Sequence, residues 1–153
     1  MSTSATNEKV IAITGASSGI GEETAKQLVN NGFNVALLAR SEDKLRALVE
    51  ELGNDVAFAV KADVSDFKDV DTAFKKVSKH FGRIDGIFAN AGRGAKAAGI
   101  EKGDVDDWDG MLGANVNGLL YTAKAGLPYL RDTQGHFIIT SSVAGRIALK
   151  GSV

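Results

Sequence analysis

Three glycines near the start of the chain have the spacing of a phosphate-binding turn. In Thr14-Gly15-Ala16-Ser17-Ser18-Gly19-Ile20-Gly21 they form a GxxxGxG pattern directly after an apolar run. Gly15 permits a sharp turn, Gly19 lets the backbone approach a pyrophosphate, and Gly21 allows close packing of a helix on a strand. Unpaired amides at the start of the next helix favour phosphate charge. The alternative is a glycine-rich turn without a ligand, but the position between a buried strand and an amphipathic helix favours nucleotide binding.

The residue after the second apolar strand indicates which nucleotide is bound. NAD sites usually carry an acid there for the ribose 2′-hydroxyl, whereas an arginine accommodates a 2′-phosphate. Here Ala39 occupies the position of the acid and Arg40 follows it. No carboxylate repels a phosphate, and a guanidinium can bind one with two hydrogen bonds. The sequence therefore predicts NADP(H) rather than NAD(H); the alternative is that Arg40 is a solvated loop residue.

Taken together, the motifs resemble those of one protein family. The glycine turn, Asp63-Val64, Asn90-Ala91-Gly92, Asn115 and Ile139-Thr140-Ser141-Ser142-Val143-Ala144-Gly145 stand in the order and spacing of the short-chain dehydrogenases/reductases. The resemblance covers the chain from about Lys9 to its end. It implies an oxidoreductase that interconverts the alcohol and carbonyl forms of a small molecule by hydride transfer, with NADP as the cofactor. The cofactor-binding residues that we expect are Gly15, Ser17, Ser18, Gly19, Ile20, Gly21, Arg40, Asp63, Val64, Asn90, Ala91 and Gly92, and the catalytic ones are Ser142 and Asn115.

The resemblance also implies individual roles. Asp63 would bond the adenine amino group, with Val64 beside the ring, and residues 90–92 would stabilise the sheet and flank the nicotinamide ribose. Asn115 would lie in a break of a long helix and hold a proton-relay water. Ser142, rather than Ser141, would orient the substrate carbonyl.

Simpler roles stay open for the same residues. Asp63 can cap a turn, residues 90–92 can simply end a strand, and Ser142 can do the same for a later strand. Asn115 can hydrogen-bond within a helix loosened by neighbouring glycines. Each helical glycine costs up to about 1 kcal/mol relative to alanine, which indicates close approach of another backbone or a ligand. These glycines are Gly110, Gly113 and Gly118.

The family's acid/base pair, Tyr-x-x-x-Lys, is absent from the sequence. In the family the tyrosine follows the serine by about a dozen positions, and this chain stops at Val153. Neither Tyr121 nor Tyr129 has a lysine four residues later. Loss of general acid/base help costs about 10²–10⁴-fold in rate, so we expect little or no turnover and a chain that is the N-terminal portion of a longer reductase. The alternatives are a non-catalytic nucleotide-binding fragment or pseudoenzyme and, less favoured, another doubly wound nucleotide user such as a methyltransferase.

Two further groups of residues predict structure rather than chemistry. Asp104, Asp106, Asp107 and Asp109 lack the glycine and distal glutamate of a calcium loop, so they are expected to cap a helix rather than bind a metal. Tyr121 and Lys124 are three residues apart and precede the serine, so we expect them at the surface or an interface.

The elements that position these residues alternate between strand and helix. Apolar runs predict strands at 10–13, 35–39, 56–60, 84–89 and 137–139. Helices are expected at 19–31 with Ile20, Leu28 and Val29 inward; after a Ser41 cap; over Phe67 to Phe81; and at 108–130. The expected inner face of the last helix is Leu112, Val116, Leu119, Leu120, Ala123 and Leu127. This alternation predicts an α/β Rossmann fold, a doubly wound parallel sheet in the order 3-2-1-4-5.

Composition places the protein among ordinary globular domains. The 153 residues are 44% hydrophobic and 24% charged, which excludes disordered and collagen-like chains. The net charge of −1 gives no reason to expect nucleic acid, no apolar run approaches a membrane span, and no cysteine is present. We expect a polar N-terminal extension at 1–8, a C-terminally incomplete dinucleotide-binding domain at 9–153 and a cytoplasmic location. By resemblance, the long helix would also help form a homodimer or homotetramer.

Overall fold

Five parallel strands form one sheet whose order is β3-β2-β1-β4-β5, which confirms the predicted topology. The computed structural model describes residues 9–147, so the expected extension at 1–8 and residues 148–153 lie outside it. The strands are β1 Val10–Thr14, β2 Asn34–Ala39, β3 Ala57–Lys61, β4 Gly86–Ala89 and β5 His136–Ile139. In-register pairs such as Ala12 with Ala36 and with Ile87 place β1 at the centre.

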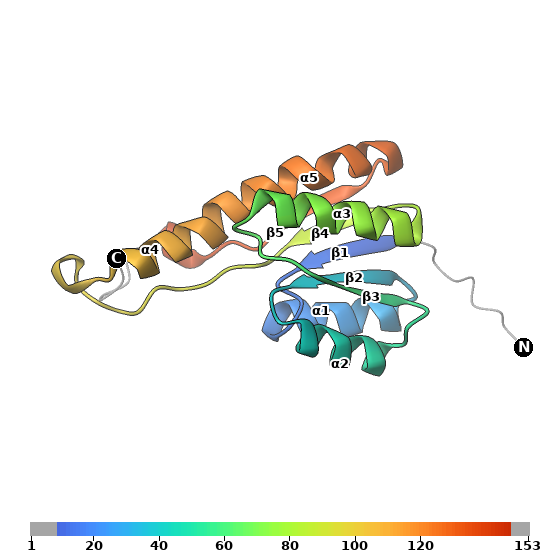
Figure 1. The fold of residues 1–153 in the computed structure, drawn as a ribbon, viewed down its shortest axis with the longest axis horizontal. Helices are drawn as coiled ribbons and strands as arrows, with labels where there is room; N and C mark the ends of the chain where they lie inside the picture. The colour runs from blue at the N-terminus through green and yellow to red at the C-terminus, as the bar shows by residue number, and fades with distance from the viewer. Residues whose placement is uncertain (1–8, 148–153) are drawn as a thin grey trace, which may run out of the picture.

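Helices cover both faces of the sheet (Figure 1). On one face lie α1 (Gly19–Asn30) and α2 (Glu42–Leu52), and on the other lie α3 (Phe67–Phe81) and α5 (Gly118–Thr133). Each face has its own apolar core, one centred on Phe74 and Ile87 and the other on Ile13 and Leu37. Preceding α5 are the short helix η1 (Ile100–Lys102), α4 (Val105–Leu112) and the π-helical turn η2 (Gly113–Asn117), and η3 (Val143–Gly145) follows β5. The helices α4 and α5 form an arm that extends beyond the sheet (Figure 1).

Of two local predictions at helix starts, one holds in position but not in its hydrogen bond, and the other was wrong. Ser41 stands at the N-cap of α2, but its side chain makes no capping hydrogen bond. Ile20 is 63% exposed rather than inward, because it lies in the first turn of α1, beyond the sheet face that Ala25 and Leu28 cover. Helix α3 has the predicted bounds, Phe67 to Phe81. Asp66 caps it, and Gly82 ends it at a φ of +77°.

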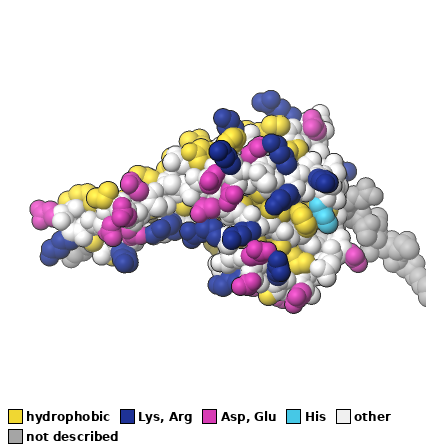
Figure 2. Space-filling model, in the orientation of Figure 1, with side chains coloured by type: hydrophobic (Ala, Val, Ile, Leu, Met, Phe, Trp, Pro, Cys, Tyr) yellow, Lys and Arg dark blue, Asp and Glu magenta, His cyan; other side chains and the backbone are white. Residues whose placement is uncertain are grey.

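The inner face of the long helix is also different from the predicted one. Leu112, Val116, Leu120 and Leu127 are all 40% exposed or more. The side that faces α3 and the sheet carries small residues instead, namely Gly118, Thr122, Ala125 and Gly126, followed by Leu130. Bulky partners explain this choice: a Cβ on Gly118 would lie 2.8 Å from the Val64 side chain, and one on Gly126 would lie 3.1 Å from the Phe74 ring. The large side chains are therefore left on the outer surface, where Figure 2 shows hydrophobic groups along the arm.

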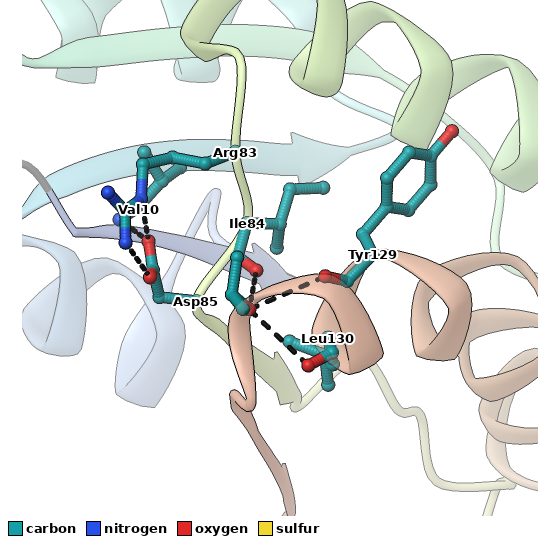
Figure 3. Close-up of polar contacts among 7 residues, drawn as sticks. Val10, Arg83, Ile84, Asp85, Tyr129 and Leu130 are labelled. Carbon is teal, nitrogen blue, oxygen red and sulfur yellow. Dashed lines mark hydrogen bonds and ion pairs between the residues drawn. The ribbon is translucent and has the colours of Figure 1, made fainter.

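Side-chain hydrogen bonds tie the amino ends of the strands together (Figure 3). The Asp85 carboxylate accepts from the Val10 amide at 2.9 Å and from Arg83 at 2.6 and 2.9 Å. The Thr133 hydroxyl at the end of α5 donates to the Ile84 carbonyl at 2.7 Å. Burial raises the pKa of Asp85, but these hydrogen bonds and the charge of Arg83 outweigh it, so the pKa lies below its ordinary value. This end of the sheet is thereby fixed, and the opposite end is left for a ligand.

Candidate functional site

The glycine turn after β1 has the geometry of a cradle for phosphate. Gly15 and Gly19 have φ values of +69° and +58°, which favour glycine. A Cβ on Gly15 would lie 2.8 Å from the Ala91 Cα, and one on Gly21 would collide with the Gly15 carbonyl oxygen. Nothing lies within 4 Å of the corresponding position on Gly19. The first-turn amides of α1 are not capped by the Ser18 side chain, so the turn offers donors beside open space.

A buried threonine joins this turn to the end of β4. The Thr14 side chain is 2% exposed, and its hydroxyl oxygen accepts from the amides of Asn90 and Ala91, both at 3.1 Å. The Asn90 side chain donates to the Thr14 carbonyl at 3.3 Å and accepts from the Thr140 hydroxyl at 3.0 Å. These bonds join the carboxyl ends of β1, β4 and β5. Sequence reasoning did not give Thr14 or Thr140 a role, although a threonine that ends a buried apolar run is a usable signal.

A cleft of about 330 Å³ opens at the carboxyl ends of β1, β2, β3 and β4. Nine of the twelve expected cofactor-binding residues line it, and Arg93, Gly110 and Ala114 also contribute. The nine are Gly15, Ser17, Ser18, Arg40, Asp63, Val64, Asn90, Ala91 and Gly92. Of the other three, Gly19 and Ile20 begin α1 and Gly21 packs against Gly15.

Arg40 and Asp63 stand near each other on this cleft. Within residues 9–147 no carboxylate forms an ion pair with Arg40, so its guanidinium is available to a ligand. Partial burial raises the pKa of Asp63, but the hydrogen bonds from Ser65 and the charge of Arg40 lower it by more. The pKa of Asp63 is therefore below its ordinary value. Asp63 accepts from the Ser65 amide at 2.9 Å and hydroxyl at 2.7 Å. It therefore caps a turn, and it lines the cleft as well.

Asn115 lies in the π-helical turn, which matches the expected break in the long helix. Its side-chain oxygen accepts from the Arg93 amide at 2.9 Å, and its amide nitrogen donates to the Arg93 carbonyl at 2.8 Å. The bonds thus cross to the loop after β4 instead of staying within the helix. Asn115 also lines a second, small cavity of about 30 Å³ together with Thr14 and Thr140, which is large and polar enough for one water.

Ser142 is exposed, and its hydroxyl oxygen accepts from the Ala144 amide at 3.1 Å. It lines neither of these two cavities. The structure thus brings the expected cofactor-binding residues together and leaves Ser142 apart from them, as the N-cap of η3. The neighbouring Thr140 is nevertheless bonded to Asn90.

The remaining groups have structural contacts. Asp104 caps α4 by accepting from the Asp106 amide at 3.0 Å, as expected. Among the residues that the structure describes, no three His, Cys, Asp or Glu side chains are placed to hold a metal ion. Tyr121 packs edge-on against Phe67, and the Lys124 ammonium lies 4.8 Å from the centre of the same ring. The close neighbour of Gly110 is the Arg93 side chain, whereas Gly118 lies against both the side chain and the backbone carbonyl oxygen of Val64, a Cβ on it being 2.8 and 3.3 Å from them.

The cleft fits a dinucleotide on its own geometry. It combines glycines that admit close approach, uncapped amides at a helix start, and Arg40, which forms no ion pair with any residue of the described range. Figure 2 shows Lys and Arg side chains gathered where the arm meets the sheet. Such a site favours an extended ligand that carries more than one phosphate.

Comparison with known proteins gives consistent results. The short chain dehydrogenase family matches residues 9–153. An uncharacterised oxidoreductase of Staphylococcus saprophyticus is 40% identical over 146 residues, which are 95% of this chain and 59% of that protein. The chain thus spans about three-fifths of the length of the curated relatives that it matches.

Solved structures resemble the fold closely. An alcohol dehydrogenase from Thermococcus sibiricus, complexed with 5-hydroxy-NADP, has a TM-score of 0.87 at 37% identity, covering 94% of this chain and 62% of that one. A 3-ketoacyl-(acyl-carrier-protein) reductase from Brucella melitensis, complexed with NADH, has a TM-score of 0.84 at 33% identity, covering 90% and 59%. None of the helices in the described part of the chain has the length and apolar character of a membrane span.

Proposed function

Since the chain belongs to the short-chain dehydrogenase family, we propose that it is the coenzyme-binding part of an NADP(H)-dependent oxidoreductase acting on a small alcohol or carbonyl compound. The observation that carries this proposal is the cleft that brings the glycine turn and Arg40 to one edge of the sheet. Structural neighbours have been solved with an NADP derivative and with NADH. The choice of NADP for this chain therefore rests on Arg40.

In this proposal the chain's own residues bind and orient the coenzyme. The first-turn amides of α1 and the Gly15 turn hold the diphosphate, and Arg40 pairs with the 2′-phosphate. Asp63 and Val64 line the adenine end, and Asn90 to Gly92 line the nicotinamide ribose. When bound, the coenzyme donates or accepts the hydride.

The substrate side is supported by fewer contacts. Ser142 would orient the substrate carbonyl once its hydroxyl leaves the Ala144 amide. Asn115 and the small cavity beside it would hold a water for proton transfer. The 153 residues contain no tyrosine with a lysine four positions later, so we expect little turnover by this chain alone. The proposal also includes a cytoplasmic location and assembly through the exposed apolar side of α4 and α5.

Calorimetric titration with NADPH and NADH tests the coenzyme assignment. We expect the wild-type chain to prefer NADPH, and Arg40→Ala to lower NADPH affinity by about 10- to 100-fold, the loss of a charge-assisted hydrogen-bonded pair. NADH affinity should change little. Arg46→Ala is a matched control, because within residues 9–147 Arg46 pairs only with Glu42, on the exposed side of α2. Absence of heat with either coenzyme would contradict the proposal, and equal NADPH affinity in Arg40→Ala would contradict the role of Arg40.

A second candidate is a nucleotide-binding protein without catalysis. The observation that favours it is the Ser142 hydroxyl, which caps η3 outside the cleft. An assay of NADPH oxidation with a panel of aldehydes and ketones separates the two, since the non-catalytic protein binds NADPH without consuming it. A preference for S-adenosylmethionine over both nicotinamide coenzymes would indicate a methyltransferase instead.

A further inference from the structure

Arg93 is an arginine of the cleft that the coenzyme assignment above does not use. It follows Asn90-Ala91-Gly92 and lines the same cleft. Its backbone is held on both sides by Asn115, which accepts from its amide and donates to its carbonyl. The main chain at this position is thereby fixed, so the side chain starts from a defined point on the cleft wall.

The Arg93 side chain is fixed as well. Its guanidinium pairs with Asp107 of α4, whose side chain is 13% exposed. The other Asp107 oxygen accepts from the Lys96 amide at 2.6 Å. The guanidinium also lies against Gly110, where a Cβ would be 2.6 Å from Nη1. A glycine at 110 is therefore what lets this group lie along the helix.

These contacts neutralise the charge of Arg93 but leave a face of its guanidinium plane accessible to a ligand. Asp107 already neutralises its charge, in contrast to Arg40, which has no ion pair among residues 9–147. The Arg93 side chain is still 39% exposed. Guanidinium planes bind aromatic rings by stacking and cation–π attraction, which an ion pair at one edge leaves possible.

The accessible face of the Arg93 guanidinium lies on the side of the cleft that Asp63, Val64 and Ser65 line. Gly110 and Ala114 of the arm line the cleft together with Asp63, Val64 and Ser65. One turn along from Gly110, a Cβ on Gly113 would lie 3.5 Å from the Cβ of Ser65, so the loop and the arm are in contact there and close this end of the cleft. A flat group bound against this closed end would lie beside Arg93.

We propose that Arg93, held by Asp107 and seated on Gly110, stacks on the nucleobase of the bound dinucleotide. This inference rests on the proposed function, because it assumes that a purine dinucleotide occupies the cleft. It assigns Arg93 to base binding and Arg40 to the 2′-phosphate. The two arginines therefore differ in which part of the ligand each one detects.

Titration of Arg93→Ala and Arg93→Lys with four ligands tests the assignment: NADPH, NADH, 2′,5′-ADP and inorganic pyrophosphate. We expect Arg93→Ala to weaken the three adenine ligands by a common factor, about 2- to 30-fold, the range for a cation–π contact. The ratio of NADPH to NADH affinity stays at its wild-type value, and pyrophosphate affinity is unchanged. Arg93→Lys keeps the charge without the plane, so it also binds the adenine ligands more weakly. Arg46→Ala again serves as the control.

Each of the other possible outcomes refutes one part of the proposal. Wild-type affinity for the adenine ligands in both variants refutes the contact between Arg93 and the base. A fall in the NADPH to NADH ratio makes Arg93 a phosphate ligand, and full affinity in Arg93→Lys shows that charge alone suffices; both refute stacking. An equal loss for pyrophosphate indicates a general structural role. If the wild-type chain binds none of the adenine ligands, the proposed function fails first, which distinguishes that failure from the others.

Discussion

Replacing Thr14 with valine should show that the residues on the floor of the cleft, Thr14 and Asn90, stabilise the fold, whereas the residues on its walls bind the ligand. Valine has nearly the shape of threonine but no hydroxyl, so packing at this buried position is preserved. The substitution removes the acceptor for the amides of Asn90 and Ala91, each 3.1 Å from the hydroxyl oxygen. It therefore leaves two backbone donors without their partner.

The expected cost follows from those two hydrogen bonds. A hydrogen bond contributes about 0.5–1.5 kcal/mol net, and a buried donor left unpaired costs about 1–3 kcal/mol. Asn90 and Ala91 are half-buried, so water can reach them in part. We expect the free energy of unfolding to fall by about 2–4 kcal/mol, a large share of the roughly 5–15 kcal/mol of a typical domain.

Urea denaturation followed by circular dichroism measures this change, with Thr122→Val as the matched control. Thr122 is equally buried, but among the described residues its hydroxyl donates only to the Gly118 carbonyl within its own helix, at 2.7 Å. Its loss should cost less than about 1 kcal/mol. If Thr14→Val is no more destabilising than Thr122→Val, the two amides do not depend on Thr14 and the reasoning is wrong.

Three further predictions test other parts of the structure. Gly21→Ala forces a Cβ onto the Gly15 carbonyl oxygen; by urea denaturation it should cost about 1–3 kcal/mol, whereas Gly94→Ala, which meets open space, should change stability by less than about 1 kcal/mol. Asp85→Asn should destabilise by about 1–3 kcal/mol at pH 7. Because folding lowers the pKa of Asp85, its contribution is complete above the unfolded pKa and is lost as pH falls through the folded value, so the gap between wild type and variant should shrink below about pH 4 in urea titrations. Leu120→Ser, at a position 60% exposed, should shift the urea midpoint of the monomer little, while Leu130→Ala, at 4% exposed, should cost about 2–5 kcal/mol; equal effects in the monomer would contradict the packing of α5.

The strands and the sheet order could be predicted because their signals are local and strong. Continuous apolar runs bounded by glycine mark strands buried on both faces, and the intervening helices require parallel pairing. The observed strand ends differ from the predicted ones by only a few residues; β4, for example, begins at Gly86 rather than at residue 84. The three turn glycines were also predictable, since a positive φ or a close approach leaves few other residues possible.

The face of α5 could not be predicted from the size of its apolar side chains. The rule that large apolar residues point inward assumes that the opposing surface has room for them. Here Phe74, Val64 and Ile87 already occupy that space, so the helix presents Gly118 and Gly126. Small residues spaced at 118, 122 and 126 were the signal that would have identified the buried side.

Arg93 was missed for a different reason. The stretch from 93 to 103 is rich in glycine and alanine, and no local pattern links it to an aspartate fourteen residues later. The ion pair with Asp107 and the contact with Gly110 depend on how the arm returns over the cleft. Long-range placement of this kind is determined by the packing of elements and not by sequence periodicity.

The location of the cleft explains why its polar residues divide into two groups. After β1 the chain crosses to α1 on one face of the sheet, and after β4 it leaves toward α4 and α5 on the other (Figure 1). The two neighbouring strands therefore part at their carboxyl ends, which opens a crevice and ends the ladder of backbone hydrogen bonds. Thr14 and Asn90 provide the missing partners on the crevice floor.

Because the floor is bonded within the protein, its side chains have little hydrogen-bonding capacity left for a ligand. The α1 amides, Arg40 and the exposed face of Arg93 remain on the walls. Substitutions of Thr14 or Asn90 should therefore lower stability first and affinity as a consequence, whereas Arg40→Ala should lower affinity at nearly unchanged stability. A loss of stability as large for Arg40→Ala as for Thr14→Val would show that the two groups are not separate.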